Sequence, residues 1–236
     1  MSDAPAFLRF DSADEMNRAL AAEIASRLAA GAGRNSRASL VASGGTTPGD
    51  LYDILSGEDA PWANVSVTLS DERWVDPTSP RSNEHLLRTR LLRHKAAAAH
   101  LVPLKTEAGH ADAAEAEVGA ALAQMPRPFD VMLLGMGNDL HTASLVPGSE
   151  GLARALDRND PALVRAIRPP EDTNMGERMT MTLRAILDAR WIALLIRGEA
   201  KLQAYQKALA GHDVLSAPVR AVLQQRAVSV SVYWSN

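Results

Sequence analysis

The chain of 236 residues contains no cysteine, which excludes disulfide bonds and thiolate metal sites. No apolar run approaches the roughly 20 residues that a membrane-spanning helix requires. The net charge of −3 gives no electrostatic reason to expect nucleic acid or a membrane surface as a partner. The N-terminal MSDAPAFLRFDS lacks a basic segment followed by an apolar stretch, so we expect no signal peptide. Together these absences predict a cytoplasmic protein.

Segments with helical periodicity alternate with short apolar runs along the chain. Ser12 and Glu15 have the spacing of a capping box, and the first helix should therefore begin at Ser12 and continue to Ala30. Gly31 and Gly33 should end it. Further helices are predicted at 48–55, from Ser82 onward, at 111–124 and at 199–210, and strands at 38–42, 65–69, 101–104, 129–134, 163–167, 178–182, 191–196 and 228–234.

This alternation predicts an α/β fold. It is typical of a doubly wound, mostly parallel, open sheet with helices on both faces, as in Rossmann-like proteins. The chain is long enough to bury a substantial core. It contains no internal repeat, no low-complexity tract and no linker long enough to separate domains. We therefore expect residues 1–236 to form a single domain.

The run FDVMLL at 129–134 predicts a strand buried on both faces. Gly135 and Gly137 interrupt the run, so the chain should turn at the carboxyl end of this strand. Ligands of open parallel sheets bind in the crevice beyond the strand ends. Asp139 and His141 follow the turn directly, with two hydroxyl residues, Thr142 and Ser144, just after them. This loop is the strongest candidate for a reaction centre.

His141 is suited to general-base catalysis, because a neutral imidazole can take a proton from water near pH 7. A carboxylate at Asp139 could bind the other ring nitrogen and fix its tautomer. The alternative is a structural histidine beside an aspartate that only stabilises the turn. The other five histidines have no comparable surroundings, and no cluster of residues has metal-ligand spacing, so we expect no metal.

Polar segments also follow the strands predicted at 38–42 and 65–69. SGGTTP at 43–48 combines glycines, hydroxyls and a helix start, which is typical of an anion site, although a simple capped turn would read the same way. Asp71 and Arg73 follow the strand at 65–69, where Arg73 could bind phosphate or carboxylate by two hydrogen bonds. Lys201 and Arg178 are either cleft cations or ordinary surface residues.

Several of these motifs occur together and in order: SGGTTP, SDERWV, SNEHLL, LLGMGNDLHTASLVPG, RMTMT and GEAKLQAYQKAL. With this set the chain resembles the 6-phosphogluconolactonases of the glucosamine-6-phosphate isomerase/6-phosphogluconolactonase family, over nearly its whole length. The resemblance implies hydrolysis of 6-phospho-D-glucono-1,5-lactone, a step of the oxidative pentose phosphate pathway, without metal or cofactor. It implies a small sugar-phosphate lactone as the binding partner, and a monomer or small homo-oligomer.

The resemblance also implies roles for individual residues. His141 would activate the attacking water and Asp139 would support it. Backbone N–H groups of the 135–144 loop or a basic side chain would stabilise the oxyanion. The remaining residues would bind the substrate, and the resemblance does not assign which of them contact its phosphate and which its hydroxyls. They are Ser43, Gly44, Gly45, Thr46, Thr47, Asp71, Arg73, Asn83, Gly135, Gly137, Arg178 and Lys201.

One position departs from the family pattern, because Leu140 stands where the family usually has glycine between the aspartate and the histidine. If that position requires a positive φ, leucine is strained there and the loop is reshaped. Two other functions stay open. A glucosamine-6-phosphate deaminase would need further acid–base carboxylates, but the first acid after His141 is Glu150. A non-catalytic sugar-phosphate sensor has only Leu140 in its favour.

Overall fold

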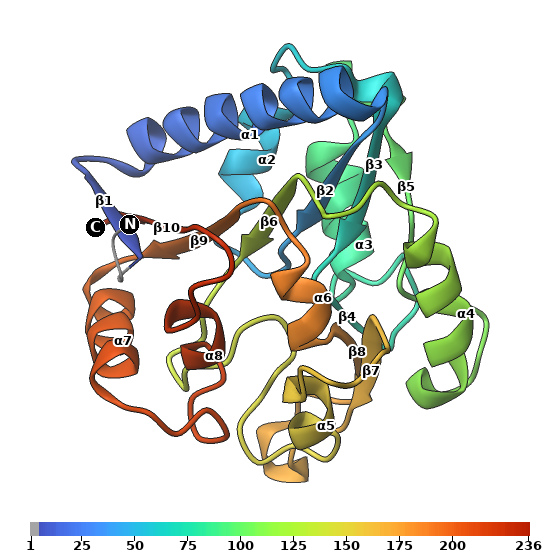
Figure 1. Ribbon diagram of the computed structural model, residues 1–236, viewed down its shortest axis with the longest axis vertical. Helices are drawn as coiled ribbons and strands as arrows, with labels where there is room; N and C mark the ends of the chain where they lie inside the picture. Colours follow the sequence, from blue (N-terminus) through green and yellow to red (C-terminus); the bar gives the residue numbers. More distant parts are fainter. Residues whose placement is uncertain (1–4) are drawn as a thin grey trace.

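Two β-sheets organise the chain (Figure 1). The computed structural model describes residues 5–236, so the prediction about the N-terminal segment falls partly outside the described residues. The larger sheet has the order β1-β10-β9-β6-β2-β3-β5, and each of its pairings is parallel. Its strands are β1 (Ala6–Phe10), β2 (Ala38–Ala42), β3 (Val65–Leu69), β5 (His100–Leu101), β6 (Val131–Leu134), β9 (Ile192–Arg197) and β10 (Val230–Ser235). The predicted parallel α/β fold is confirmed.

Strand β6, which the sequence indicated as doubly buried, lies in the middle of the larger sheet, between β9 and β2. It begins at Val131, two residues later than predicted. Asp130 precedes it with a buried carboxylate that accepts from the Ser39 N–H at 3.0 Å and pairs with Arg34 at 2.7 Å. Phe129 forms an isolated bridge with Ala189 instead of joining the ladder. These contacts fix the amino end of the central strand.

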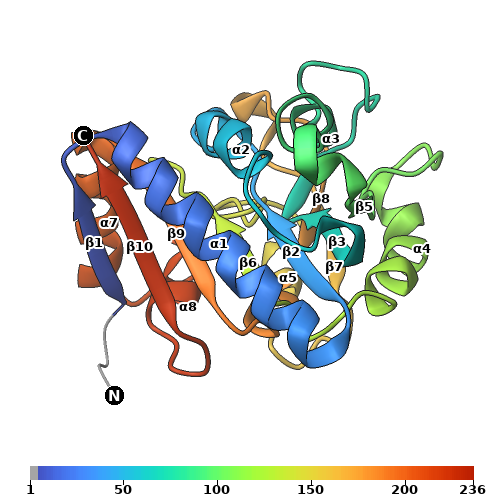
Figure 2. The ribbon, with the colours of Figure 1, turned by 90° about the horizontal axis from the view of Figure 1, so that it is seen from above.

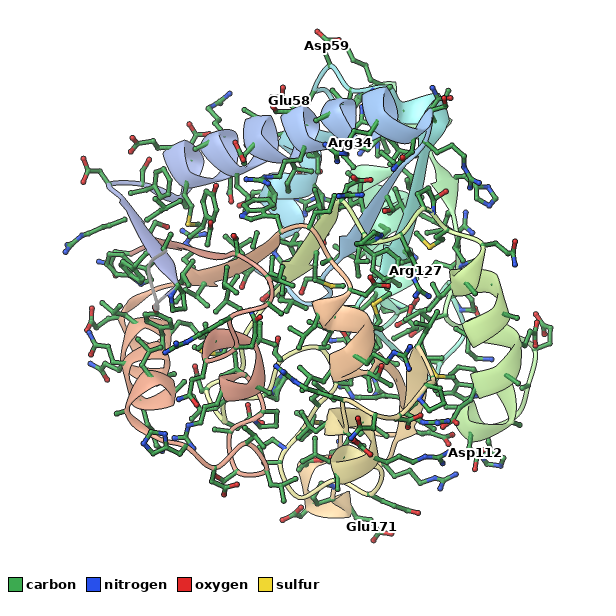
Figure 3. The ribbon with its side chains drawn as sticks, in the orientation of Figure 1. Arg34, Glu58, Asp59, Asp112, Arg127 and Glu171 are labelled. Carbon is green, nitrogen blue, oxygen red and sulfur yellow. The ribbon has the colours of Figure 1, made fainter. Side chains whose placement is uncertain are left out.

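Helix α1 (Ala13–Asn35) crosses one face of the larger sheet (Figure 2). It starts as predicted, with the Ser12 side chain accepting from the Glu15 N–H. The predicted end at the glycines is wrong, because the helix continues to Asn35 and ends where Ser36 adopts φ 59°. Gly31 is buried against the Asp130 carboxylate, where a Cβ would collide with it. Arg34 reaches the same carboxylate from the last turn (Figure 3), so tertiary contacts carry the helix past its glycines.

The other helices are shorter and lie on both sides of the sheet. Helix α7 (Glu199–Ala210), on the face opposite α1, has the predicted bounds (Figure 2). Helices α2, α3 and α4 lie where they were predicted, while α5, α6 and α8 were missed because four or five residues are too few to show a helical period. The bounds are α2 (Gly49–Leu55), α3 (Asn83–Leu86), α4 (Ala111–Ala123), α5 (Leu152–Leu156), α6 (Leu183–Leu187) and α8 (Arg220–Leu223).

A second, antiparallel sheet has the order β4-β8-β7. It contains β4 (Asp71–Arg73), β7 (Val164–Ile167) and β8 (Arg178–Met181). Only Ser70 separates β3 from β4, and it is bonded to both sheets: its N–H donates to the Ala42 carbonyl and its carbonyl accepts from the Met181 N–H. The small sheet therefore lies at the carboxyl end of β3. Asp112, at the start of α4, forms an ion pair with Arg168 just after β7 (Figure 3). This pair links α4 to the edge strand of the small sheet.

Strand β1 was not predicted. It lies at the edge of the larger sheet and four of its five residues are exposed, so it shows no alternating pattern. Phe7 stacks against Tyr205 and Trp234. The buried apolar side chains form one continuous cluster. The organisation of the chain as a single domain stays a prediction. Within residues 5–236 no helix has the length and apolar character to cross a membrane.

Candidate active site

A cleft of about 240 Å³ lies beyond the carboxyl ends of β2, β3 and β6, between the two sheets. All but one of the residues to which the family resemblance assigns a role line it: Ser43, Gly44, Gly45, Thr46, Thr47, Asp71, Arg73, Asn83, Gly135, Gly137, His141, Arg178 and Lys201. The exception, Asp139, lies directly behind the ring of His141. The sequence missed the apolar part of the wall, which comes from Leu134, Met136, Ala143, Leu195 and Ile196.

The Asp139 carboxylate lies 2.6 Å from Nδ1 of His141. Among residues 5–236 the other ring nitrogen, Nε2, has no hydrogen-bond partner, and the ring lines the cleft with 27% of its side chain exposed. Burial disfavours ionisation of Asp139, but the hydrogen bond and charge of His141 outweigh it and lower the pKa of the carboxyl. An ionised Asp139 requires a proton on Nδ1, which leaves Nε2 able to accept one.

The backbone turn beneath this pair depends on glycine. The Gly137 N–H donates to the His141 carbonyl at 2.9 Å, and the side chains of Asp139 and His141 lie directly over Gly137. A Cβ at position 137 would collide with both of them. The two hydroxyls expected in the reaction centre are buried instead: Thr142 donates to the Gly135 carbonyl, and Ser144 donates to Asp71. Their role is to fix the loop.

Leu140 has φ 68°, which is the left-handed conformation that is unfavourable for a residue with a side chain. The turn adopts this conformation with leucine at position 140. The Leu140 side chain is buried, with 4% of its surface exposed. Ala143, three residues later, also has a positive φ of 49°. Two residues with side chains therefore hold left-handed conformations around His141.

Lys201 reaches this turn from the first turn of α7. Its Nζ donates to the Met136 carbonyl at 2.7 Å. Burial lowers the pKa of Lys201, and the nearby Asp139 charge opposes that shift. The cation therefore lies beside the Asp139–His141 pair.

Asp71 and Arg73 lie on the same side of β4, because side chains alternate along a strand, and both line the cleft. Asp71 accepts from Ser144 at 2.6 Å and lies 3.6 Å from Arg178. Burial lowers the pKa of Arg178, and the Asp71 charge partly offsets this. The Nε atoms of Arg73 and Arg178 are buried, and neither has a hydrogen-bond partner within residues 5–236. Both guanidinium groups line the cleft, and their planar sets of donors are suited to an anionic ligand.

Glu72, on the opposite side of β4, is the residue that the sequence analysis did not single out. Its fully buried carboxylate accepts from the backbone N–H groups of Arg73, Asn83 and Glu84 and from the Ser82 hydroxyl, at 2.7–2.9 Å. Burial raises the pKa of this carboxyl, and the four donors counteract the shift. The sequence did contain a signal for this role, because a residue between Asp71 and Arg73 on a strand must point its side chain to the opposite face. Glu72 holds the start of α3 against β4.

Asn83 is thereby placed over the glycine-rich loop. Its Nδ2 donates to the Asp71 carbonyl at 2.8 Å, while its buried Oδ1 has no partner in the described part of the chain. A Cβ on Gly44 would collide with the Asn83 amide. Gly45 has a φ of 88°, a conformation that favours glycine. The Tyr52 hydroxyl donates to the Ser43 carbonyl at 2.5 Å. Asn83 and Tyr52 therefore hold the loop in place, and its residues 43–47 line the cleft.

Comparison with known proteins identifies the family of the chain. Residues 11–234 match the family described as glucosamine-6-phosphate isomerases/6-phosphogluconolactonase. The chain belongs to this family. A 6-phosphogluconolactonase of Mesorhizobium japonicum is 43% identical over 227 residues, which cover 96% of this chain and 93% of that protein. The crystal structure of a 6-phosphogluconolactonase from Shewanella baltica superposes with a TM-score of 0.95 at 42% identity and covers 98% of each chain.

The fold alone does not separate the two activities named in the family. A monomeric glucosamine-6-phosphate deaminase superposes with a TM-score of 0.76 at 20% identity, covering 98% of this chain and 97% of that one. The distinction has to come from the side chains of the site. Asp71 is the one carboxylate among the residues that line the cleft within the described range, and it is bonded to Ser70 and Ser144. Glu150, the first acid after His141, is 74% exposed and pairs with Arg168 outside the cleft.

Proposed function

We propose that the protein hydrolyses 6-phospho-D-glucono-1,5-lactone to 6-phospho-D-gluconate, with His141 as the general base. The observation that carries this proposal is the Asp139–His141 pair, in which Nδ1 is bonded at 2.6 Å while the ring lines a cleft with cationic walls. The names of relatives at 35–43% identity support the substrate class. The shortage of cleft carboxylates favours this reaction over deamination, which needs further acid–base groups.

The proposed mechanism has two steps. Nε2 of His141 takes a proton from water as the water oxygen attacks C1 of the lactone, and the carbonyl electrons move onto the carbonyl oxygen. The tetrahedral intermediate then collapses, the bond between C1 and the ring oxygen breaks, and His141 returns its proton to that oxygen. Asp139 keeps the ring in the required tautomer and stabilises its protonated form.

The cleft supplies charge for an anionic substrate. Arg73, Arg178 and Lys201 offset the phosphate and the developing oxyanion, and the guanidinium groups of both arginines line the cleft, where they can make charge-assisted hydrogen bonds. The Ser43–Thr47 loop and Asn83 add uncharged polar groups. As part of the same proposal we place the reaction in the cytoplasm, since a chain without cysteine suits a reducing compartment.

His141→Ala tests the proposal most directly. In an assay that supplies fresh 6-phosphogluconolactone, we expect the rate above spontaneous hydrolysis to fall roughly 10²–10⁴-fold, the usual contribution of a general base. His212→Ala, which removes an exposed histidine outside the cleft, is the matched control and should leave the rate unchanged.

The competing functions predict other results. Release of ammonia from glucosamine 6-phosphate by the wild-type protein would reassign the site to deamination. Tight binding of 6-phosphogluconate without turnover of either substrate would indicate a sensor. Full lactonase activity in His141→Ala would exclude the proposed base.

A further inference from the structure

Leu140 combines two features that rarely occur together. Its φ of 68° lies in the left-handed region, which is unfavourable for a residue with a Cβ, and its side chain is buried in the continuous apolar cluster. Strained backbone persists only where the surroundings over-determine it. The contacts of the leucine side chain are therefore expected to maintain the conformation of the turn.

The backbone of Leu140 is bonded on both sides. Its N–H donates to the Gly137 carbonyl at 3.1 Å, which closes the turn. Its carbonyl accepts from the Val219 N–H, also at 3.1 Å, at the start of α8. The residue between Asp139 and His141 thus attaches the turn to the start of α8.

Further hydrogen bonds hold α8 in place. Arg220, which is 8% exposed, donates from Nε to the Ala208 carbonyl at 3.0 Å and from Nη1 to the Asp213 carbonyl at 2.8 Å. These bonds join α8 to the last turn of α7 and to the loop between them. The first turn of α7 carries Lys201, which binds the Met136 carbonyl. The turn is therefore held at both ends, at residue 136 by α7 and at residue 140 by α8.

We propose that Leu140 is a positioning residue. Its buried side chain and its carbonyl hold the 136–141 turn against α8, so that the Asp139–His141 pair faces the cleft. The catalytic part of this inference rests on the proposed function, whereas the anchoring part does not. Nothing else about the site requires a leucine here, because the side chain is not among those that line the cleft in the described part of the chain.

Three substitutions separate the contributions of packing and backbone. Leu140→Ala removes the packing but keeps the unfavourable Cβ, so the turn should loosen most. Leu140→Gly removes both, and should be impaired less. Leu140→Met keeps a buried apolar side chain of similar size and should restore wild-type behaviour. Leu152→Ala, which shortens a similarly buried leucine in α5 away from the cleft, is the matched control for a general loss of core packing.

Two measurements test the proposal. Amide hydrogen exchange reports on the turn directly, and in Leu140→Ala we expect the Gly137 and Val219 N–H groups to exchange at least about tenfold faster than in Leu152→Ala. Steady-state kinetics with the lactone should show kcat lowered about ten- to a hundredfold in Leu140→Ala, with KM within about twofold, because misplaced reacting groups affect chemistry more than binding.

The outcomes distinguish the two proposals. Exchange and kcat in Leu140→Ala within about twofold of the Leu152→Ala values would overturn the inference. Faster exchange at Gly137 and Val219, in a protein whose wild type hydrolyses no lactone, would support the anchoring role and overturn the proposed function. Failure of Leu140→Met to restore either measurement would show that packing is not the cause, and would also overturn the inference.

Discussion

The two ends of the central strand β6 carry polar clusters of opposite character. At the amino end, the Asp130 carboxylate is enclosed by Arg34, Ser39 and Arg190, which lie at 2.7, 3.0 and 3.5 Å. At the carboxyl end, the cleft contains buried polar atoms of Arg73, Asn83 and Arg178 for which the described chain supplies no partner. Both clusters combine a buried carboxylate with arginine side chains, but they differ in how completely their buried polar atoms are hydrogen-bonded. The completed cluster stabilises the fold, and the incomplete one is suited to a ligand.

The largest expected effect comes from Asp139→Asn at the incomplete end. The asparagine amide can donate to Nδ1 of His141, which would leave the proton on Nε2 and remove the base. We expect kcat to fall roughly 10²–10⁴-fold in the lactone assay. The unfolding midpoint in urea should change little, because the Asp139 side chain is 44% exposed. A variant with normal kcat would remove Asp139 from the mechanism.

Asp130→Asn makes the matching change at the complete end. Loss of the charge on this buried carboxylate weakens its hydrogen bonds from the Ser39 N–H and Arg34, so the free energy of unfolding should fall by about 1.5–3 kcal/mol. Urea denaturation measures this loss. The kcat of the folded protein should stay at the wild-type value, since Asp130 lies at the opposite end of the strand from the cleft. A large loss of kcat without loss of stability would contradict the comparison.

A smaller effect is expected from Arg73→Ala. A charge-assisted hydrogen bond contributes about 1.5–3 kcal/mol, so affinity for 6-phosphogluconate should fall about ten- to a hundredfold by calorimetry. Stability should fall by about 1 kcal/mol, because the substitution also removes the hydrogen bond from Nη1 of Arg73 to the Arg81 carbonyl at 2.7 Å. Arg73→Lys keeps the charge without the planar fork and should recover only part of the affinity. Unchanged affinity in Arg73→Ala would exclude its role as an anion ligand.

The sequence predicted the parts of the molecule that depend on local pattern. Helix α7 and strands β2 and β3 have their predicted bounds, because apolar periodicity and punctuating residues coincide there. The predicted cleft residues of the loops after β2 and β6 converge for a simpler reason, since the carboxyl ends of parallel strands meet at one edge of a sheet.

The features that the sequence did not predict depend on contacts between distant residues. Helix α1 passes Gly31 because Asp130 lies against it, 99 positions later in the chain. The separation of β4, β7 and β8 into their own antiparallel sheet depends on pairings between Asp71 and Thr180 that no local pattern encodes. Leu140 shows the same limit, because its left-handed backbone is held by packing that only the folded chain provides.

The single residue between β3 and β4 has a consequence for how such a site can change. Successive side chains of an extended chain point to opposite faces. The number of residues between β3 and β4 therefore determines that Asp71 and Arg73 face the cleft while Glu72 faces α3. Lengthening the junction by one residue would exchange those two faces and present the glutamate to the substrate.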